Sequence, residues 1–307
     1  MRIFLTGATG YIGGAVLDAL VRGGHEVTAL VRDNQKAART KARGAHPIVG
    51  NLADPESYRA AADAQDGYIH TAYDSTSNGG PSVDRSALDL IIKAAKRRRT
   101  AGSKAPKKRF IIYTSGVWVL GPAPEPVTED APINPVSLVA WRPEHEQLIL
   151  RAAGPRLRTI VVRPGIVYGG GHGIVGDLLK SASNGLVRVI GDGNNHWPLV
   201  YDRDLADLYA RLAADEDATG IYHANDEGDE RVNDIVSAIA PYLPVRPDVR
   251  HVPIEEARNK MGAFADALAL DQVVRSARAR ALGWTPTLHS VAGNAARLLE
   301  EWRASRT

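Results

Sequence analysis

A cluster of glycines near the N-terminus has the spacing of a phosphate-binding turn. Residues 6–13 have the sequence TGATGYIG, with a glycine at every third position from Gly7 to Gly13. In such a turn the first glycine permits a tight bend, the second lets the backbone approach a pyrophosphate, and the third allows a helix to pack close to the preceding strand. Backbone N–H groups at the start of that helix would bind the phosphates. The residues expected at a dinucleotide are Thr6, Gly7, Thr9, Gly10, Tyr11, Ile12 and Gly13.

The residues around this turn support the assignment. An apolar run at 3–5 precedes it, and apolar residues of helical period follow it as far as Gly23 and Gly24, which are typical of a helix end. Residues 26–31 then form a second apolar run that predicts a strand. A strand, a glycine-rich turn, a helix and a second strand in this order predict a βαβ unit.

The residue after the second strand indicates which of the two nicotinamide dinucleotides is bound. An acid there would bind the ribose 2′-hydroxyl of NAD(H), whereas an arginine accommodates the 2′-phosphate of NADP(H). Arg32 stands at this position and Asp33 follows it. A guanidinium can pair with phosphate and stack on adenine, so the sequence favours NADP(H) over NAD(H). The alternative, in which Arg32 is merely exposed and Asp33 binds the ribose, remains open.

The elements that would position this site alternate along the first half of the chain. Further apolar runs predict strands at 46–50, 67–72, 109–114 and 159–163, and helices are predicted at 55–64 and 84–99. Apolar strands separated by helices indicate a parallel sheet covered on both faces. We expect an α/β fold, with a doubly wound, Rossmann-type dinucleotide-binding domain and a smaller substrate domain. The expected boundaries are 1–167 for the first domain, to which 198–225 returns, and 168–307 for the second.

Motifs along most of the chain resemble those of one protein family. The turn has the form TGxxGxxG, and further similar motifs are RPGIVYG at 163–169, GDG at 191–193, LVYDRDLA at 199–206 and LGWTP at 282–286. On these residues the chain resembles the short-chain dehydrogenase/reductase superfamily, in its extended, NAD-dependent epimerase/dehydratase-like branch. The resemblance implies the Rossmann-type fold, a site at the carboxyl ends of the strands between the two domains, and a homodimer.

The resemblance also implies cofactor contacts beyond the turn. GNL at 50–52 stands where the family has Gly-Asp-Leu, whose acid contacts adenine, and Asn51 would make that contact as an amide. HTA at 70–72 resembles the end of the family's fourth strand, which lies along the cofactor. Together with Arg32, the implied cofactor-binding residues are Asn51, Leu52, Thr71, Ala72, Thr114, Arg142 and Pro164.

The chain departs from the family pattern at the catalytic residues. The family uses a Tyr as general acid and base, a Lys four residues later that stabilises the phenolate, and a Ser or Thr after the fifth strand. No Tyr of this chain is followed by Lys four residues later, so the YxxxK motif is lacking. After the fifth strand, the position of the catalytic hydroxyl falls on Gly116, and Ser115 is one residue early.

Two alignments of the expected catalytic helix are open. If Glu146 matches a Glu that the family has four residues beyond its Lys, then Arg142 replaces Lys and Leu138 replaces Tyr. In the other alignment, Trp141 and His145 replace Tyr and Lys. We prefer the first, because apolar residues follow Glu146 as they do in that family's helix. Arg142 would keep the positive charge at the ribose, but an arginine stays charged and is a poor proton donor.

Other side chains could supply the missing proton or contact the substrate. Tyr73 lies just past the fourth strand, although a packed aromatic is an equal explanation, and His145 titrates near neutrality but could be a surface residue. The catalytic candidates are therefore Ser115, Arg142, His145 and Tyr73. A glycine-rich loop and the segment after GDG supply the substrate candidates, which are His172, His196 and Trp197. Histidine on that loop could donate a proton, whereas tryptophan is commonly core.

The charge of the chain comes from one segment. It has 38 Lys and Arg against 35 Asp and Glu, and nine of the 38 lie in residues 93–109, which contain no acid. Cations at a helix C-terminus complement its dipole, so we expect a solvated helix end and loop there. No aromatic residue interleaves these cations, which argues against nucleic acid as a partner.

Composition excludes several other classes of protein. The chain has no Cys, which excludes a disulfide framework and thiolate metal sites, and we expect no metal. No apolar run approaches the roughly 18 residues needed to span a membrane. Met1 leads almost directly into an apolar strand without a signal peptide, so we expect a cytoplasmic protein without a membrane partner.

These observations predict an NADP(H)-dependent oxidoreductase with an atypical active site. Its substrate would be a small molecule with a carbonyl, an imine or an activated double bond, since hydride chemistry belongs to the cofactor. One alternative is a nonenzymatic NADP(H)-binding regulatory protein, which the lacking YxxxK motif favours. Another is a nucleotide-sugar epimerase or dehydratase, which would need the Tyr that this chain lacks.

Overall fold

The computed structural model describes residues 1–63, 65–74, 79–97 and 108–306. These residues form two compact units. Unit 1 comprises Met1–Ser115, Trp141–Val162 and Ala206–Ile221, and unit 2 comprises Gly116–Ala140, Arg163–Leu205 and Tyr222–Thr307. The assignment of residues 1–167 to the cofactor and of 168–307 to the substrate stays a prediction.

The predicted parallel sheet is present. It has seven strands in the order β12-β7-β5-β4-β1-β2-β3, and the neighbours from β7 to β3 pair in parallel. The strands are β1 (Arg2–Thr6), β2 (Glu26–Val31), β3 (His46–Val49), β4 (Gly67–His70), β5 (Arg109–Thr114), β7 (Leu157–Pro164) and β12 (Gly220–Ala224). The helices between them are α1 (Tyr11–Arg22), α2 (Asn34–Ala42), α3 (Arg59–Asp63), α4 (Gly80–Lys96), α5 (Arg142–Leu150) and α7 (Asp202–Ala214).

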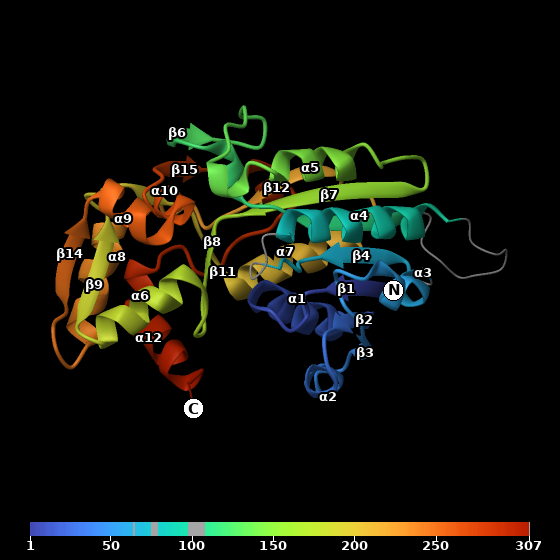
Figure 1. Ribbon diagram of the computed structural model, residues 1–307, viewed down its shortest axis with the longest axis horizontal. Helices are drawn as coiled ribbons and strands as arrows, with labels where there is room; N and C mark the ends of the chain where they lie inside the picture. The colour runs from blue at the N-terminus through green and yellow to red at the C-terminus, as the bar shows by residue number, and fades with distance from the viewer. Residues whose placement is uncertain (64, 75–78, 98–107, 307) are drawn as a thin grey trace. The chain divides into compact units, whose positions relative to one another are not determined.

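Both faces of this sheet are buried by helices. Phe4, Tyr68 and Tyr113 belong to one cluster with the side chains of α3, α4 and α5, and Figure 1 shows α4 and α5 next to each other. Successive side chains of a strand point to opposite faces. Ile3 and Leu5, both fully buried, therefore face the other side, where α1 packs against β1 and β2. The α/β, doubly wound class is confirmed.

Helix α4 differs from its predicted range. It begins at Gly80, four residues before the predicted start, and Pro81 lies in its first turn. Proline is favoured there because the N–H that it lacks would have no partner within the helix. The predicted end at residue 99 lies outside the described residues, and the helix ends at Lys96.

The described part of the basic segment is not all solvated. Residues 98–107 lie outside the described residues. Arg109, at the start of β5, is buried, and its Nη1 donates to the carbonyls of Ala94, Ala95 and Arg97 at 3.0, 3.0 and 2.8 Å. These are carbonyls at the C-terminus of α4, where helices leave acceptors without intrahelical partners. Arg109 therefore serves to cap a helix, contrary to the expectation of a solvated segment.

Unit 2 pairs its strands two by two. The pairs are β10 with β13, β11 with β8, β14 with β9 and β15 with β6. These strands are β6 (Ala123–Val127), β8 (Ile166–Tyr168), β9 (Leu186–Ile190), β10 (His196–Trp197), β11 (Leu199–Tyr201), β13 (Glu230–Arg231), β14 (Asp248–Val252) and β15 (Gln272–Val274). The helices are α6 (Gly173–Ser183), α8 (Val232–Ile239), α9 (Ile254–Met261), α10 (Ala263–Leu268), α11 (Ala277–Ala281) and α12 (Ala295–Ala304). Trp197, Trp302 and Tyr168 lie in its apolar core.

Within the described residues, no helix combines the length and the apolar character needed to cross a membrane.

Candidate functional site

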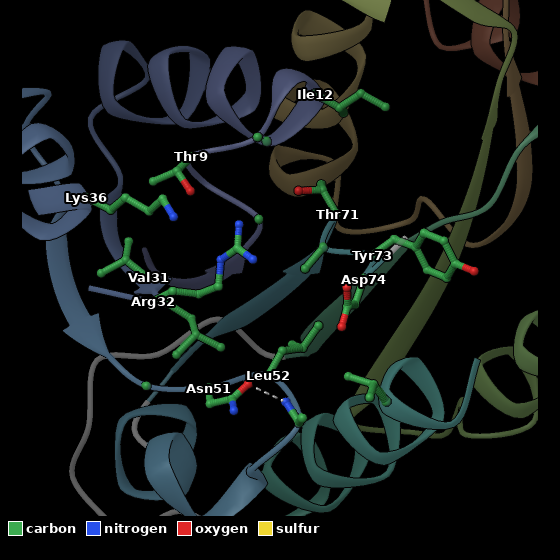
Figure 2. Close-up of a pocket in the computed structure, with 18 of the residues that line it drawn as sticks. Thr9, Ile12, Val31, Arg32, Lys36, Asn51, Leu52, Thr71, Tyr73 and Asp74 are labelled. Carbon is green, nitrogen blue, oxygen red and sulfur yellow. Dashed lines mark hydrogen bonds between the residues drawn. The ribbon is translucent and has the colours of Figure 1, made fainter. Parts of the chain in front are cut away.

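Unit 1 contains a cavity of about 520 Å³ at the carboxyl ends of β1, β2 and β4. Figure 2 shows Arg32 and Lys36 on one side of it and Tyr73 on the other. Ligands of open α/β sheets bind at this edge of the strands. The lining residues are Gly7, Thr9, Gly10, Tyr11, Ile12, Gly13, Leu30, Val31, Arg32, Lys36, Gly50, Asn51, Leu52, Ala53, Thr71, Ala72, Tyr73, Asp74 and Val83.

The glycine-rich turn leaves no room for side chains. A Cβ on Gly13 would lie 2.2 Å from the carbonyl oxygen of Gly7, and a Cβ on Gly7 would lie 2.6 Å from Thr71 Oγ1. Gly7 also has φ +79°, a conformation that other residues rarely adopt. Helix α1 starts directly after Gly10, and no described side chain caps it or places an acid in its first turn. Its positive end therefore faces the cavity, as an anion site requires.

Two cations line the cavity next to β2, where an acid would select NAD(H). Arg32 follows the last residue of β2, and Lys36 lies in the first turn of α2. Asp33 caps α2 instead, since its Oδ1 accepts from the backbone N–H of Lys36 at 2.8 Å and its Oδ2 lies 3.1 Å from Lys36 Nζ. The backbone hydrogen bond from Lys36 lowers the pKa of Asp33. Asp33 is not among the residues that line the cavity.

Residues after β3 and β4 complete this wall. Asn51 and Leu52 follow β3 and line the cavity, and Asn51 Oδ1 accepts from the N–H of Ala53 at 3.0 Å (Figure 2). The contact with adenine expected of Asn51 stays a prediction. Thr71 and Ala72 follow β4 and also line the cavity, and Thr71 Oγ1 donates to the carbonyl of Thr6 at 2.8 Å.

Three side chains are stacked at the other side of the cavity. The rings of Tyr73 and Trp141 are nearly parallel, with centroids 5.3 Å apart and an angle of 11°. The guanidinium carbon of Arg142 lies 4.5 Å from the Trp141 ring centroid and 5.4 Å from that of Tyr73. Arg142 Nη1 donates to the carbonyl of Thr114 at 3.0 Å. The stack therefore holds a fixed positive charge beside an aromatic ring that lines the cavity.

A buried hydrogen-bonded network lies behind this stack. Asp84 of α4 accepts from His145 Nδ1 at 2.6 Å, from His70 Nε2 at 3.1 Å and from the Tyr113 hydroxyl at 3.1 Å. The other ring nitrogen of His70, Nδ1, lies 2.7 Å from the hydroxyl of Thr6. Burial alone would raise the pKa of Asp84, but the hydrogen bonds from His145 and His70 outweigh it and hold this pKa well below its usual range.

Several predicted site residues lie outside the cavity lining. Thr6 is fully buried and bonded to His70, and Thr114 Oγ1 lies 2.6 Å from the hydroxyl of Tyr209. Ser115 is buried, and no described group bonds its hydroxyl. His145 is 5% exposed, which corrects the surface position considered for it. The cofactor and catalytic roles assigned to these residues stay predictions.

Unit 2 contains the remaining predicted residues. Pro164 ends β7 and is buried, while His172 is exposed and directly precedes α6. His196 Nδ1 lies 2.8 Å from Asp271 Oδ1, and the indole of Trp197 donates to the carbonyl of Leu268 at 2.9 Å within the core. No described contact tests the substrate roles predicted for His172, His196 and Trp197.

Sequence reasoning missed two residues that the structure brings to this site. Lys36 follows Arg32 by four residues, and a cation so close to the second strand could have been noted as a second partner for a phosphate. Asp84 shares a helix face with the apolar residues Leu88 and Ile91, which is a signal for a buried partner. Its partners His70 and His145 are far apart in the sequence, so only the fold identifies them.

The residues of the cavity fit a phosphate-bearing dinucleotide. The missing Cβ atoms of Gly7 and Gly13 leave a backbone cradle at the positive end of α1, and two cations stand next to β2. A lining with these features is what a pyrophosphate and an additional phosphate require.

Comparisons with known proteins agree with this geometry. Residues 3–224 match the model of the "NAD dependent epimerase/dehydratase family". An uncharacterized protein of Schizosaccharomyces pombe, C2A9.02, is 33% identical over 94% of this chain and 95% of its own length. The 2-alkyl-3-oxoalkanoate reductase of Stenotrophomonas maltophilia is 29% identical over 66% of this chain and 62% of its own length. A structure of the human epimerase family protein SDR39U1 with NADPH has the same fold, with a TM-score of 0.80, 22% identity, and coverage of 98% of this chain and 99% of that one.

Proposed function

The chain belongs to the NAD-dependent epimerase/dehydratase family, a family of NAD(P)-dependent enzymes, and we propose that it is an NADP(H)-dependent oxidoreductase. Its proposed substrate is a small organic molecule whose carbonyl is reduced, with imines and activated double bonds as related acceptors. When bound, the cofactor supplies the hydride. The protein supplies orientation, charge and a proton.

The observation that carries the choice of NADP(H) is the arrangement after β2. Arg32 and Lys36 both line the cavity where a 2′-phosphate would lie. Asp33, the residue that would bind a 2′-hydroxyl in NAD(H), is engaged as the cap of α2 and as the ion-pair partner of Lys36. A phosphate placed there would gain two charge-assisted contacts, which are the strong class of hydrogen bond.

Removal of either cation tests this proposal. Arg32→Ala and Lys36→Ala should each weaken NADPH binding roughly 10- to 100-fold, because each removes one charge-assisted contact. NADH binding should change less than about twofold, since NADH has no 2′-phosphate. Fluorescence titration of both cofactors measures these affinities. A preference for NADPH that survives both substitutions would refute the roles given to Arg32 and Lys36.

The reduction of a carbonyl is supported by a relative and by the missing Tyr. The Stenotrophomonas relative is named a reductase of 2-alkyl-3-oxoalkanoates, which carry a ketone. In the preferred alignment the position of the family Tyr is occupied by Leu138, which cannot exchange a proton. An epimerase or dehydratase depends on that base, whereas an activated carbonyl makes a smaller demand on a protein acid.

A screen of NADPH oxidation distinguishes this function from a regulatory one. We expect turnover with an activated ketone such as ethyl acetoacetate or 9,10-phenanthrenequinone, tested beside a cyclic imine and 2-cyclohexenone. Tight NADPH binding without oxidation by any of these acceptors would favour the second candidate, a nonenzymatic NADP(H)-binding regulator, for which the absence of YxxxK is the specific observation.

A further inference from the structure

The proposed reduction needs a proton donor, and the candidates in unit 1 are unequal. Arg142 stays charged at any pH of interest. His145 is buried and directs its Nδ1 to Asp84, and neither residue lines the cavity. Ser115 is also buried and absent from the lining. Tyr73 is 43% exposed and lines the cavity, and Figure 2 shows its hydroxyl pointing away from Arg32.

Tyr73 lies at the end of the cavity that a nicotinamide would reach. Arg32 and Lys36 mark the end for the adenosine 2′-phosphate, and the turn at Gly10 marks the pyrophosphate. Figure 2 shows Tyr73 on the side of the cavity away from Arg32, beyond Thr71. A dinucleotide that extends from Arg32 across the turn therefore brings its second base toward Tyr73.

Two positive groups lie beside the Tyr73 side chain. The guanidinium of Arg142 lies 5.4 Å from the centre of its ring, fixed by the carbonyl of Thr114 and the face of Trp141. The first turn of α4 lies against the hydroxyl, because a Cβ on Gly80 would be 2.9 Å from Tyr73 Oη. The N-terminus of this 17-residue helix carries partial positive charge. A negative charge that develops on this side chain during a reaction would lie beside both groups.

We propose that Tyr73 is the proton donor of this reductase, in place of the Tyr of the YxxxK motif. This inference rests on the proposed function. As the carbonyl carbon accepts a hydride from NADPH, the C=O π bond opens toward its oxygen. The O–H bond of Tyr73 breaks and its proton joins that oxygen, so the product is an alcohol. The phenolate that remains is stabilised by Arg142 and α4, and a proton from water restores it.

Chemical modification tests the position of Tyr73 without a turnover assay. Tetranitromethane nitrates accessible tyrosines, and mass spectrometry of peptides locates the product. We expect NADPH to slow nitration of Tyr73 about tenfold, whereas adenosine 2′,5′-bisphosphate, which reaches only the Arg32 end, changes it less than twofold. Tyr242, which is 51% exposed in unit 2, is the internal control. Equal protection by both compounds, or none by NADPH, would overturn the proposal.

Kinetics of Tyr73→Phe test the transfer of the proton. With ethyl acetoacetate or 9,10-phenanthrenequinone as acceptor, kcat should fall about 100-fold or more, the usual contribution of a general acid. The Kd for NADPH should stay within twofold, and Tyr242→Phe should leave kcat unchanged. A kcat within threefold of the wild-type value would overturn the proposal. If the wild-type protein reduces no acceptor while NADPH still protects Tyr73, the proposed reduction fails, and the placement of Tyr73 at the nicotinamide end is retained.

Discussion

At the glycine-rich turn the geometry of the cavity is set mainly by the backbone, whereas at the Tyr73 end it is set by side chains from segments that are distant in the sequence. A Cβ on Gly13 would collide with Gly7 and Thr71, and a Cβ on Gly7 would collide with Thr71 and Ala72. The absence of a side chain at both glycines therefore shapes the turn. Tyr73 lies just after β4, whereas Trp141 and Arg142 lie at the start of α5, so only the fold brings the three side chains together. A site built from the backbone is recognisable in the sequence as a regular spacing of glycines. A site built from distant side chains appears in the sequence only as isolated residues.

The largest expected effect comes from filling the backbone cradle. Gly13→Val should weaken NADPH binding about 100-fold or more, because its Cβ would lie 2.2 Å from the carbonyl oxygen of Gly7. Gly154→Ala is the matched control, since a Cβ there meets no atom within 4 Å. Fluorescence titration measures the affinity, and circular dichroism verifies the fold. Normal NADPH binding by Gly13→Val would remove the distinction between the turn and the Tyr73 end.

The network behind the Tyr73 end should respond in stability. Asp84→Asn replaces a carboxylate that accepts three hydrogen bonds, so it should lower the free energy of unfolding at pH 7 by about 3 kcal/mol. Urea unfolding measures this change. Asp207→Asn is the control, because it alters an exposed ion pair with Arg211 and should change the free energy of unfolding little. His70→Ala would not serve as a control, because it also opens a cavity.

The same variant predicts a pH dependence. The pKa of Asp84 is lower in the folded protein than in an unfolded chain, so its contribution is present above the unfolded pKa and is lost as pH falls through the folded pKa. The difference in unfolding free energy between wild type and Asp84→Asn should therefore shrink as the pH falls below about 4. A difference that grows below about pH 4 would contradict the assigned network.

The smallest effect is expected at Asp33, beside Arg32. Because Asp33 caps α2, Asp33→Asn retains an acceptor for the cap and should change the NADH affinity less than about twofold. If Asp33 instead bound the ribose of NADH, Asp33→Asn should weaken NADH binding about tenfold. Parallel titrations of NADH and NADPH decide between the two outcomes.

The sequence predicted the sheet and the cradle well for physical reasons. Strand β2 has the predicted bounds of 26–31, because an apolar run between a helix-ending Gly pair and a charged residue has few alternatives. The glycines of the turn are constrained by contacts within a few residues of themselves and by the end of β4. Arg32 could be assigned to the position that discriminates the cofactors because that position directly follows the end of a strand.

The rest depended on contacts between segments far apart in the sequence. The cofactor role of Thr6 stays a prediction, and the contact of its hydroxyl with His70 is one that neither composition nor spacing could show. Helix spacing gave two possible alignments for Arg142 and His145. The structure directs His145 to Asp84 and places Arg142 against Tyr73, so their different environments follow only from the fold.

We propose that this cavity holds NADP(H), selected by Arg32 and Lys36. The most direct test is equilibrium titration of the wild-type protein with NADPH and with NADH under the same conditions. We predict that NADPH binds at least about tenfold tighter than NADH, because two cations line the place of its 2′-phosphate and Asp33 is engaged elsewhere. Equal affinities, or tighter binding of NADH, would contradict it.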